Sequence, residues 1–142
     1  MSVDMKYRTK ATATGGRDGH SATENGAVDV KLVTPKELGG AGGDGINPEQ
    51  LFATGYAACF MGALKFVAGQ DKVKIPAEAT VAADVGIGPR ADGGGLGLEV
   101  ALIITVPGIE ADVVDDLIAR AHVVCPYSNA TQNNIKVSLS RG

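Results

Sequence analysis

Hydrophobic and polar positions alternate in three short runs over the first third of the chain. Residues 5–14 alternate bulky or apolar with polar side chains and are rich in threonine, which predicts a half-buried strand. Shorter runs follow at residues 20–23 and 27–34, separated by Glu24-Asn25-Gly26, and Asn-Gly is a strong hairpin signal. Pro35 ends the last run. We therefore expect a three-stranded antiparallel meander.

A glycine-rich turn joins the first two predicted strands. Residues 15–19 read Gly-Gly-Arg-Asp-Gly, in which the glycines accept positive φ and the aspartate can cap its own backbone. Arg17 stands at the centre of this turn. An isolated arginine between glycines is more often an exposed turn residue than a functional cation, so both interpretations stay open at this point.

The strongest helix signal begins at Asn47. This residue is a good N-cap, Pro48 suits the first helical position, and Gln50 takes the third position of a capping box. Glu49 favours the positive end of the helix dipole. The helix should run to about Ala68, and its mostly apolar circumference predicts burial nearly all round. Small residues would let another backbone approach it closely: Gly55, Ala57, Ala58, Gly62 and Ala63.

The second half of the chain predicts a hairpin, a helix and a strand. Valine- and isoleucine-rich runs at residues 73–89 and 96–106 form the hairpin, and the last strand covers 135–140. Pro126 ends the helix between them. The apolar face of that helix repeats at a spacing of three and four residues: Ile109, Val113, Val114, Leu117, Ile118, Ala121 and Val124. This order predicts one α+β domain over residues 1–142.

Composition and charge exclude several classes of protein. The chain has 142 residues, with 13 Lys plus Arg against 16 Asp plus Glu and a net charge of -3, and it contains no basic run. A nucleic-acid partner is therefore not expected. Uninterrupted apolar stretches are shorter than the roughly 20 residues that span a bilayer, and the first ten residues lack the apolar core of a signal peptide. We expect a cytoplasmic protein without a membrane partner.

The two cysteines, Cys59 and Cys125, are the main candidates for chemistry. A lone cysteine in an apolar helix is most often a small buried hydrophobe. A reactive cysteine needs a cation, a helix N-terminus or a hydrogen-bond donor that lowers its thiol pKa from about 8.5. Arg17 is a candidate for that cation, and Glu49 lies close to three turns before Cys59 on the predicted helix.

Other chemistries fit the sequence less well. The two cysteines and two histidines lack the paired close spacings of a structural zinc site. His122 lies three residues before Cys125, which could suit a Cys-His pair, although a histidine near a helix C-terminus more often interacts with the dipole. Residues 42–45, Gly-Gly-Asp-Gly, precede a helix, but no Lys-Ser/Thr follows, so we reject a phosphate loop.

Three segments together resemble a known family. The sequences TATGGRDG at 12–19, NPEQLFATGYAACFMGAL at 47–64 and VCPYSNAT at 124–131 closely resemble the organic hydroperoxide resistance (Ohr) proteins of the OsmC/Ohr superfamily. The resemblance covers the whole chain in element order. Gln132-Asn133 departs from the Arg-Gly found in many relatives, and the loop at 39–45 is unusually rich in glycine.

The resemblance implies a fold and an activity. The fold is α+β, with antiparallel sheets packed on a buried central helix and a second helix, in an intertwined homodimer. The activity is the reduction of organic hydroperoxides to alcohols. Cys59 would be the peroxidatic cysteine and Cys125 the resolving one. Arg17 would stabilise the Cys59 thiolate, and Glu49 would hold Arg17. No cofactor or metal is implied, and the reductant would be dihydrolipoamide or a lipoylated protein.

Two further expectations follow for substrate and function. Apolar side chains near Cys59, namely Leu51, Phe52 and Phe60, would favour alkyl or fatty-acyl hydroperoxides over hydrogen peroxide. The alternative from another class is a non-catalytic dimeric module that binds an apolar ligand or senses oxidants stoichiometrically. Turnover in the presence of a dithiol distinguishes the two.

Overall fold

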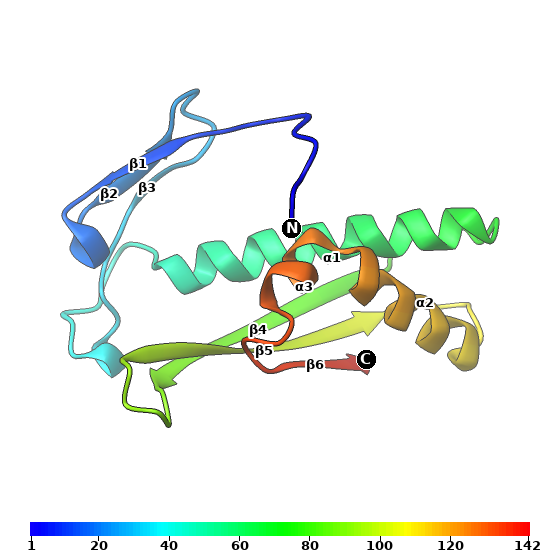
Figure 1. Ribbon diagram of the computed structural model, residues 1–142. Coiled ribbons are helices and arrows are strands. Elements are labelled where there is room, and N and C mark those ends of the chain that lie inside the picture. Colours follow the sequence, from blue (N-terminus) through cyan, green and yellow to red (C-terminus); the bar gives the residue numbers. More distant parts are fainter. The chain divides into compact units, whose positions relative to one another are not determined.

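The computed structural model describes residues 1–142 and divides into two compact units, residues 1–51 and 52–142. The structure contains two three-stranded sheets, one in each unit, and three helices, whose course along the chain can be followed in Figure 1. The structure is α+β, as the sequence predicts. Each unit is described by itself below.

The sheet of the first unit is the predicted antiparallel meander. It contains β1 (Ala11–Thr14), β2 (His20–Thr23) and β3 (Asp29–Lys31), with β2 in the centre. The strand predicted from residue 5 begins only at Ala11: residues 5–10 are all exposed, and beyond the 3.0 Å bond from the Glu24 N–H to the Lys10 carbonyl no ladder pairing with β2 is formed. β3 is likewise shorter than the predicted run, and the short 3-10 turn Lys36–Leu38 follows it.

The turn between β1 and β2 presents Arg17. Residues Gly16–Asp18 form one 3-10 turn, with Gly15 in the left-handed region at φ 73°. Gly19 closes the turn so tightly that a Cβ there would lie 1.7 Å from the carbonyl oxygen of Thr14. Asp18 accepts a 3.0 Å hydrogen bond from the backbone N–H of Thr34 and ties the turn to the chain beyond β3.

Helix α1 (Pro48–Gln70) starts where the sequence predicts. Asn47 and Gln50 form a reciprocal capping box: the Gln50 N–H donates to Asn47 Oδ1 at 2.9 Å, and the Asn47 N–H donates to Gln50 Oε1 at 3.0 Å. The helix ends at Gln70, two residues beyond the predicted end at Ala68.

Burial of α1 is confined to one stripe, so the expectation of burial all round is wrong for a single chain. The buried residues recur three and four positions apart and include Tyr56, Phe60, Leu64 and Val67. The opposite side carries exposed small residues such as Ala58 and Gly62, and Phe66 is 60% exposed. One sheet and one further helix cover only one side of a helical cylinder, which leaves this face open.

The second unit holds a longer sheet. β4 (Thr80–Pro89) and β5 (Leu96–Thr105) form an antiparallel hairpin over ten residue pairs, and β6 (Val137–Arg141) pairs with β5 in parallel. The parallel pair corrects the expectation of purely antiparallel sheets, because the helical segment between β5 and β6 returns the chain to the end where β5 began. β4 also starts at Thr80 rather than residue 73.

Two helices connect β5 to β6. Helix α2 (Ala111–Val124) ends before Pro126 as predicted, but a second short helix, α3 (Pro126–Thr131), follows at once and was not predicted. Residues from α1, β5 and α2 form one core on a single face of the sheet. It includes Phe60, Leu64, Val100, Leu102, Ile104, Val114, Leu117, Ile118 and Ala121.

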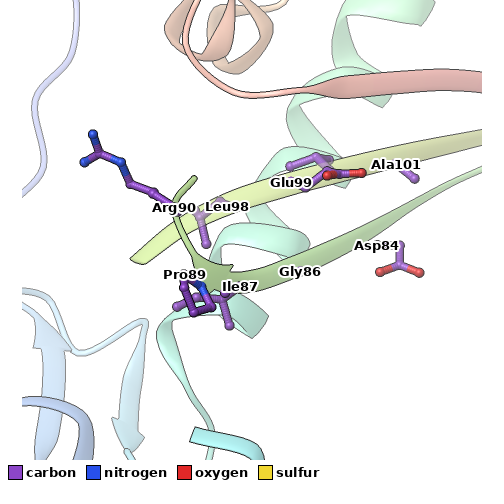
Figure 2. Close-up of a pocket in the computed structure, with 11 residues that line it drawn as sticks. Asp84, Gly86, Ile87, Pro89, Arg90, Leu98, Glu99 and Ala101 are labelled. Atoms are coloured by element: carbon purple, nitrogen blue, oxygen red, sulfur yellow. The ribbon is translucent and has the colours of Figure 1, made fainter. Parts of the chain in front are cut away.

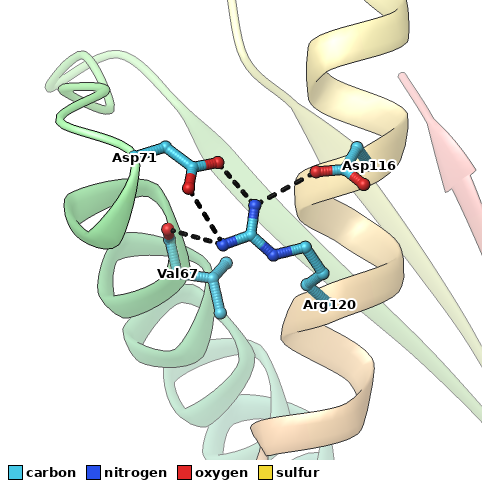
Figure 3. A network of polar contacts seen from close by, with 4 residues as sticks. All are labelled: Val67, Asp71, Asp116 and Arg120. Atoms are coloured by element: carbon cyan, nitrogen blue, oxygen red, sulfur yellow. Dashed lines mark hydrogen bonds and ion pairs between the residues drawn. The ribbon is translucent and has the colours of Figure 1, made fainter.

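Arg120 joins α2 to the C-terminal end of α1 (Figure 3). Its guanidinium bonds both carboxylate oxygens of Asp71, which follows α1, and donates to the carbonyl oxygen of Val67 at 3.3 Å. Asp116, one turn earlier on α2, lies 3.1 Å from the same side chain. The Val67 carbonyl belongs to the last turn of α1, where backbone acceptors lack helical partners.

By length and composition alone, α1 could cross a membrane. The core helix of a folded domain passes the same test, and α1 packs its stripe of large side chains into the core of the second unit. We therefore interpret α1 as a core helix.

Candidate active site

The two cysteines lie side by side in the second unit. Cys59 is on α1, and Cys125 is the residue between α2 and α3. Both are free thiols, and the Cys125 thiol points at Cys59 with 3.6 Å between the two sulfurs. Cys125 is completely buried, whereas Cys59 is partly exposed. Solvent therefore reaches one residue of the pair, Cys59, and not the other.

Local structure explains how the chain presents Cys125. Its backbone N–H bonds the Ala121 carbonyl at 2.9 Å and so completes the last turn of α2. Its own conformation is extended, with φ -65° and ψ 123°, because the following Pro126 disfavours the helical conformation. Pro126 then occupies the first turn of α3, where the missing N–H costs nothing. The chain thus bends at Cys125.

Burial governs the ionisation of Cys59. Desolvation raises the pKa of the Cys59 thiol, and the adjacent Cys125 adds to this effect. The backbone N–H of Tyr127 bonds the Cys59 sulfur and acts in the opposite direction, lowering the pKa. The net direction is upward. Within the second unit, the reactive thiolate is therefore disfavoured at neutral pH.

Arg17 and Glu49 form an ion pair in the first unit. Two parallel hydrogen bonds join them, Nη1 to Oε2 at 2.9 Å and Nη2 to Oε1 at 2.7 Å. Their hydrogen bond holds the pKa of the Glu49 carboxyl below its ordinary value and raises the pKa of Arg17. The bidentate fork fixes the plane of the guanidinium as well as its position.

The four residues singled out from the sequence thus form two pairs. The structure brings Cys59 to Cys125 in the second unit, and Arg17 to Glu49 in the first. Glu49 lies in the first turn of the helix that carries Cys59. The effect of Arg17 on the Cys59 thiolate stays a prediction.

Of the two aromatic side chains that the sequence suggested near Cys59, only Phe52 is partly exposed. Phe60 is fully buried in the core and cannot line a substrate site. Phe52, Tyr56 and Tyr127 form a cluster instead, with ring centroids 5.8 to 6.2 Å apart. The Tyr127 ring lies over Gly55, where a Cβ would come within 3.2 Å of it. Sequence reasoning missed Tyr127, although it stands two residues after Cys125.

The sequence allowed two roles for His122, a partner of Cys125 or a charged group at the C-terminus of α2, and the structure shows a different contact. Its Nδ1 lies 2.8 Å from the hydroxyl oxygen of Ser128 on α3. Burial lowers the pKa of His122 below its ordinary value of 6.5, which favours the neutral imidazole at pH 7. A neutral side chain contributes no charge to the C-terminus of α2.

A hollow of the surface lies away from the sulfurs. It has a volume of about 580 Å³, and the strands β4 and β5 line it near their hairpin end. In Figure 2 the charged side chains of Asp84, Glu99 and Arg90 lie apart and do not converge on one point. Neither cysteine contributes to it, so we do not assign the chemistry to this hollow. No group of three or more His, Cys, Asp or Glu side chains is placed to hold a metal ion.

Sequence comparisons identify the relatives of this chain. The family profile of the OsmC-like proteins matches residues 40–140. An organic hydroperoxide resistance protein of Xanthomonas axonopodis pv. citri is 57% identical over 134 residues, which cover 94% of this chain and 93% of the relative. The organic hydroperoxide resistance protein OhrB of Bacillus subtilis is 38% identical over 133 residues, covering 94% and 96% of the two chains.

Solved structures give the same result. An organic hydroperoxide resistance protein from Elizabethkingia anophelis, with thiocyanate bound, has a TM-score of 0.91 at 49% identity over 99% of both chains. A related protein from Vibrio cholerae, with captopril in one of its active sites, has a TM-score of 0.89 at 48% identity, covering 99% of this chain and 94% of that one.

Fold, paired cysteines and relatives together define a class of redox protein with the OsmC-like fold. Within that class, the chain belongs to the organic hydroperoxide resistance (Ohr) family of the OsmC/Ohr superfamily.

Proposed function

We propose that this protein is a cysteine-based peroxidase that reduces organic hydroperoxides to alcohols. The relatives are organic hydroperoxide resistance proteins, which supports a redox role in peroxide defence. The observation that carries the proposal is the sulfur pair, a partly exposed thiol 3.6 Å from a buried one. This asymmetry suits a first thiol that meets the peroxide and a second that receives the oxidised product.

The proposed reaction has three steps: oxidation of Cys59, formation of the disulfide, and its reduction by a dithiol. The Cys59 thiolate attacks the terminal oxygen of the hydroperoxide, the O–O bond breaks, and the leaving alkoxide takes a proton to become the alcohol. Cys59 is then a sulfenic acid. The Cys125 thiol condenses with it, forming a disulfide and releasing water. A dithiol such as dihydrolipoamide or a lipoylated protein reduces the disulfide by two thiol-disulfide exchanges and becomes a disulfide itself.

Arg17 is proposed to favour the Cys59 thiolate. The family resemblance implies this role, and two observations support it. Burial raises the pKa of Cys59, so the reaction requires a cation to offset that effect. Arg17 stays charged and is oriented by its two bonds to Glu49.

Turnover tests the proposal directly. With dihydrolipoamide and lipoamide dehydrogenase supplied, the protein should consume many equivalents of tert-butyl hydroperoxide per chain. Cys59→Ser should abolish consumption, whereas Cys125→Ser should allow one oxidation and block efficient recycling. Consumption that stops after one equivalent in the unsubstituted protein would favour the stoichiometric sensor instead.

A matched pair of arginine variants tests the thiolate assignment. Arg17→Ala should move the pH profile of Cys59 oxidation to higher pH, because the thiol loses its cation. Arg8→Ala removes the same charge from an exposed residue of the N-terminal segment and should leave the profile in place. Equal profiles for both variants would contradict the role of Arg17.

Apolar surroundings predict the substrate class. Phe52 packs against the Tyr127 ring, the backbone N–H of Tyr127 bonds the Cys59 sulfur, and apolar surfaces of this kind bind alkyl groups by burial. Cumene and fatty-acid hydroperoxides should therefore react faster than hydrogen peroxide. Equal efficiency for all three would contradict this expectation.

A second copy of this chain is the proposed partner. The first unit buries a single hydrophobic side chain, Leu32, and exposes Val3, Met5, Tyr7 and Val28. A three-stranded sheet needs more burial than this to be stable. The open face of α1 also carries the exposed Phe66. A homodimer, as the resemblance implies, would cover such surfaces, and the cytoplasm, where thiols stay reduced, is the proposed location.

A further inference from the structure

A buried network of hydroxyl groups and an imidazole surrounds the bend at Cys125. The Ser128 hydroxyl oxygen lies 2.8 Å from both Tyr56 Oη and His122 Nδ1. Tyr56 Oη also lies 3.3 Å from the Thr131 hydroxyl, which donates to the Ser128 carbonyl at 3.1 Å. Tyr56 is fully buried, and Ser128 is 1% exposed. Polar groups in an apolar core are costly unless they are bonded, and none of these lacks a partner.

Each hydroxyl has one proton, and this fixes the direction of the network. Thr131 must donate to the Ser128 carbonyl, since a carbonyl only accepts, so Tyr56 must donate to Thr131. The Ser128 hydroxyl then donates to Tyr56 and accepts from His122. The geometry therefore requires a proton on Nδ1 of His122. Because burial also favours the neutral ring, the expected form is the neutral Nδ1–H tautomer.

The network connects α1, which carries Cys59, to α2 and α3, which flank Cys125. His122 stands three residues before Cys125 on α2, and Ser128 stands three residues after it on α3. Tyr56 stands three residues before Cys59 on α1, on the buried stripe. The His122–Ser128 bond closes the bend in which Cys125 lies, and the Tyr56–Ser128 bond attaches that bend to the helix of Cys59.

Disulfide formation depends on this arrangement. The sulfurs are 3.6 Å apart as thiols, and a disulfide brings them to about 2.0 Å with a narrow range of dihedral angles. A displacement of the Cys125 bend by about 1 Å can reduce such a reaction by about a hundredfold.

We propose that His122, Ser128 and Tyr56 are positioning residues that hold Cys125 against Cys59 for the resolving step, with His122 as the Nδ1–H donor that orders the network. None of the three is required to touch the peroxide. The inference rests on the proposed peroxidase function, in which Cys125 resolves the oxidised Cys59.

Separate measurement of the two oxidation steps tests the proposal. One equivalent of tert-butyl hydroperoxide is added, and quenched samples are analysed by mass spectrometry for dimedone-trapped sulfenic acid and for disulfide. His122→Leu and Ser128→Ala should slow disulfide formation by about tenfold or more and lengthen the lifetime of the sulfenic acid. The first oxidation should stay within about twofold, because neither side chain contacts the peroxide.

Conservative and control variants separate positioning from general loss of structure. His122→Asn places an amide group where Nδ1 stands and should restore most of the disulfide rate. His20→Leu removes the other histidine of the chain, in the first unit, and should change neither step. Equal slowing of both steps in Ser128→Ala, or wild-type disulfide rates in both network variants, would overturn the proposal.

A spectroscopic measurement tests the network without any variant. The imidazole nitrogen shifts of His122 in the unsubstituted protein should show the Nδ1–H tautomer, and Ser128→Ala should abolish that preference. An Nε2–H tautomer would overturn the assigned direction even if the variants failed to fold. Tyr56→Phe retains the ring and should slow disulfide formation less than Ser128→Ala does.

Failure of the proposed peroxidase function can be distinguished from failure of the positioning role. If the unsubstituted protein forms no disulfide with peroxide, the Cys59–Cys125 couple can still be equilibrated with reduced and oxidised dithiothreitol. The network then predicts a less stable disulfide in Ser128→Ala than in the unsubstituted protein. Equal stability there would contradict the positioning role.

Discussion

A few neighbouring groups determine the pKa of the Cys59 thiol. The surrounding apolar side chains and the Cys125 thiol raise the thiol pKa, and the Tyr127 N–H is the donor that favours the thiolate. Cys125 lies deeper and is completely buried. Two chemically identical side chains thus differ in solvent access, and the different roles proposed for them rest on this difference.

The Arg17–Glu49 pair predicts a loss of stability in acid. The folded pKa of Glu49 lies below its ordinary value of 4.5, so the folded chain binds fewer protons than the unfolded chain near that pH. This stabilisation is complete above pH 4.5 and is lost as the pH falls further. The melting temperature should therefore fall more steeply between about pH 6 and pH 3 in the unsubstituted protein than in Glu49→Gln.

A control distinguishes this pair from the other carboxylates. Glu37→Gln removes an exposed carboxylate of the same unit and should leave the acid decline unchanged. The aspartates whose pKa values are also lowered, Asp18, Asp71 and Asp92, are common to all three proteins and cancel in the comparison. Parallel declines in the unsubstituted protein and Glu49→Gln would contradict the prediction.

Gly55→Ala tests how firmly the Tyr127 ring is held. Alanine is better than glycine inside a helix by about 1 kcal/mol, but the new Cβ would lie 3.2 Å from the ring. Tyr127 is 41% exposed and can shift by a few tenths of an ångström. Denaturant unfolding should therefore show unchanged or slightly raised stability. A loss of more than about 2 kcal/mol would mean that the ring cannot move.

At the scale of elements, sequence signals worked best where they are local. The start of α1 follows from Asn47, Pro48 and Gln50, since a capping box involves only neighbours in the chain. The three-stranded meander follows from its turns for the same reason. Helix α3 was not predicted because Pro126 signals the end of α2, and proline is also over-represented in the first turn of a new helix.

The Arg120 contacts predict a stabilising connection between α1 and α2. Arg120→Met removes the bonds to Asp71 and Val67 and should lower the melting temperature, most clearly at low salt, where ion pairs are least screened. Asp116→Asn removes only the partner one turn away and should have a smaller effect. Unchanged melting of Arg120→Met at low salt would contradict the connection.

The whole molecule consists of two units with unequal cores. The second unit contains the entire buried apolar cluster, and the one buried hydrophobic side chain outside it, Leu32, lies in the first unit. The first unit exposes several large hydrophobic side chains, among them Tyr7 at 78%. This imbalance is the physical basis of the proposed dimer.

Equilibrium ultracentrifugation tests the dimer. At micromolar concentration the protein should sediment with twice the 14.4 kDa mass of the chain. Phe66→Asp, on the exposed face of α1, should shift the equilibrium toward the monomer. Val113→Asp on α2 is the matched control, because it places the same charge on an exposed side chain outside the α1 face. A stable monomer of the unsubstituted protein would contradict the assembly.

The sequence by itself determined the order of elements other than α3, the α1 cap, the Arg17 turn and the two cysteines of interest, because each depends on residues near in the chain. Family membership also followed from short contiguous motifs. Only the tertiary structure decided that Cys59 and Cys125 meet, that β6 runs parallel to β5, and that His122 bonds Ser128. These contacts join residues brought together by packing of the core, and no local spacing encodes them.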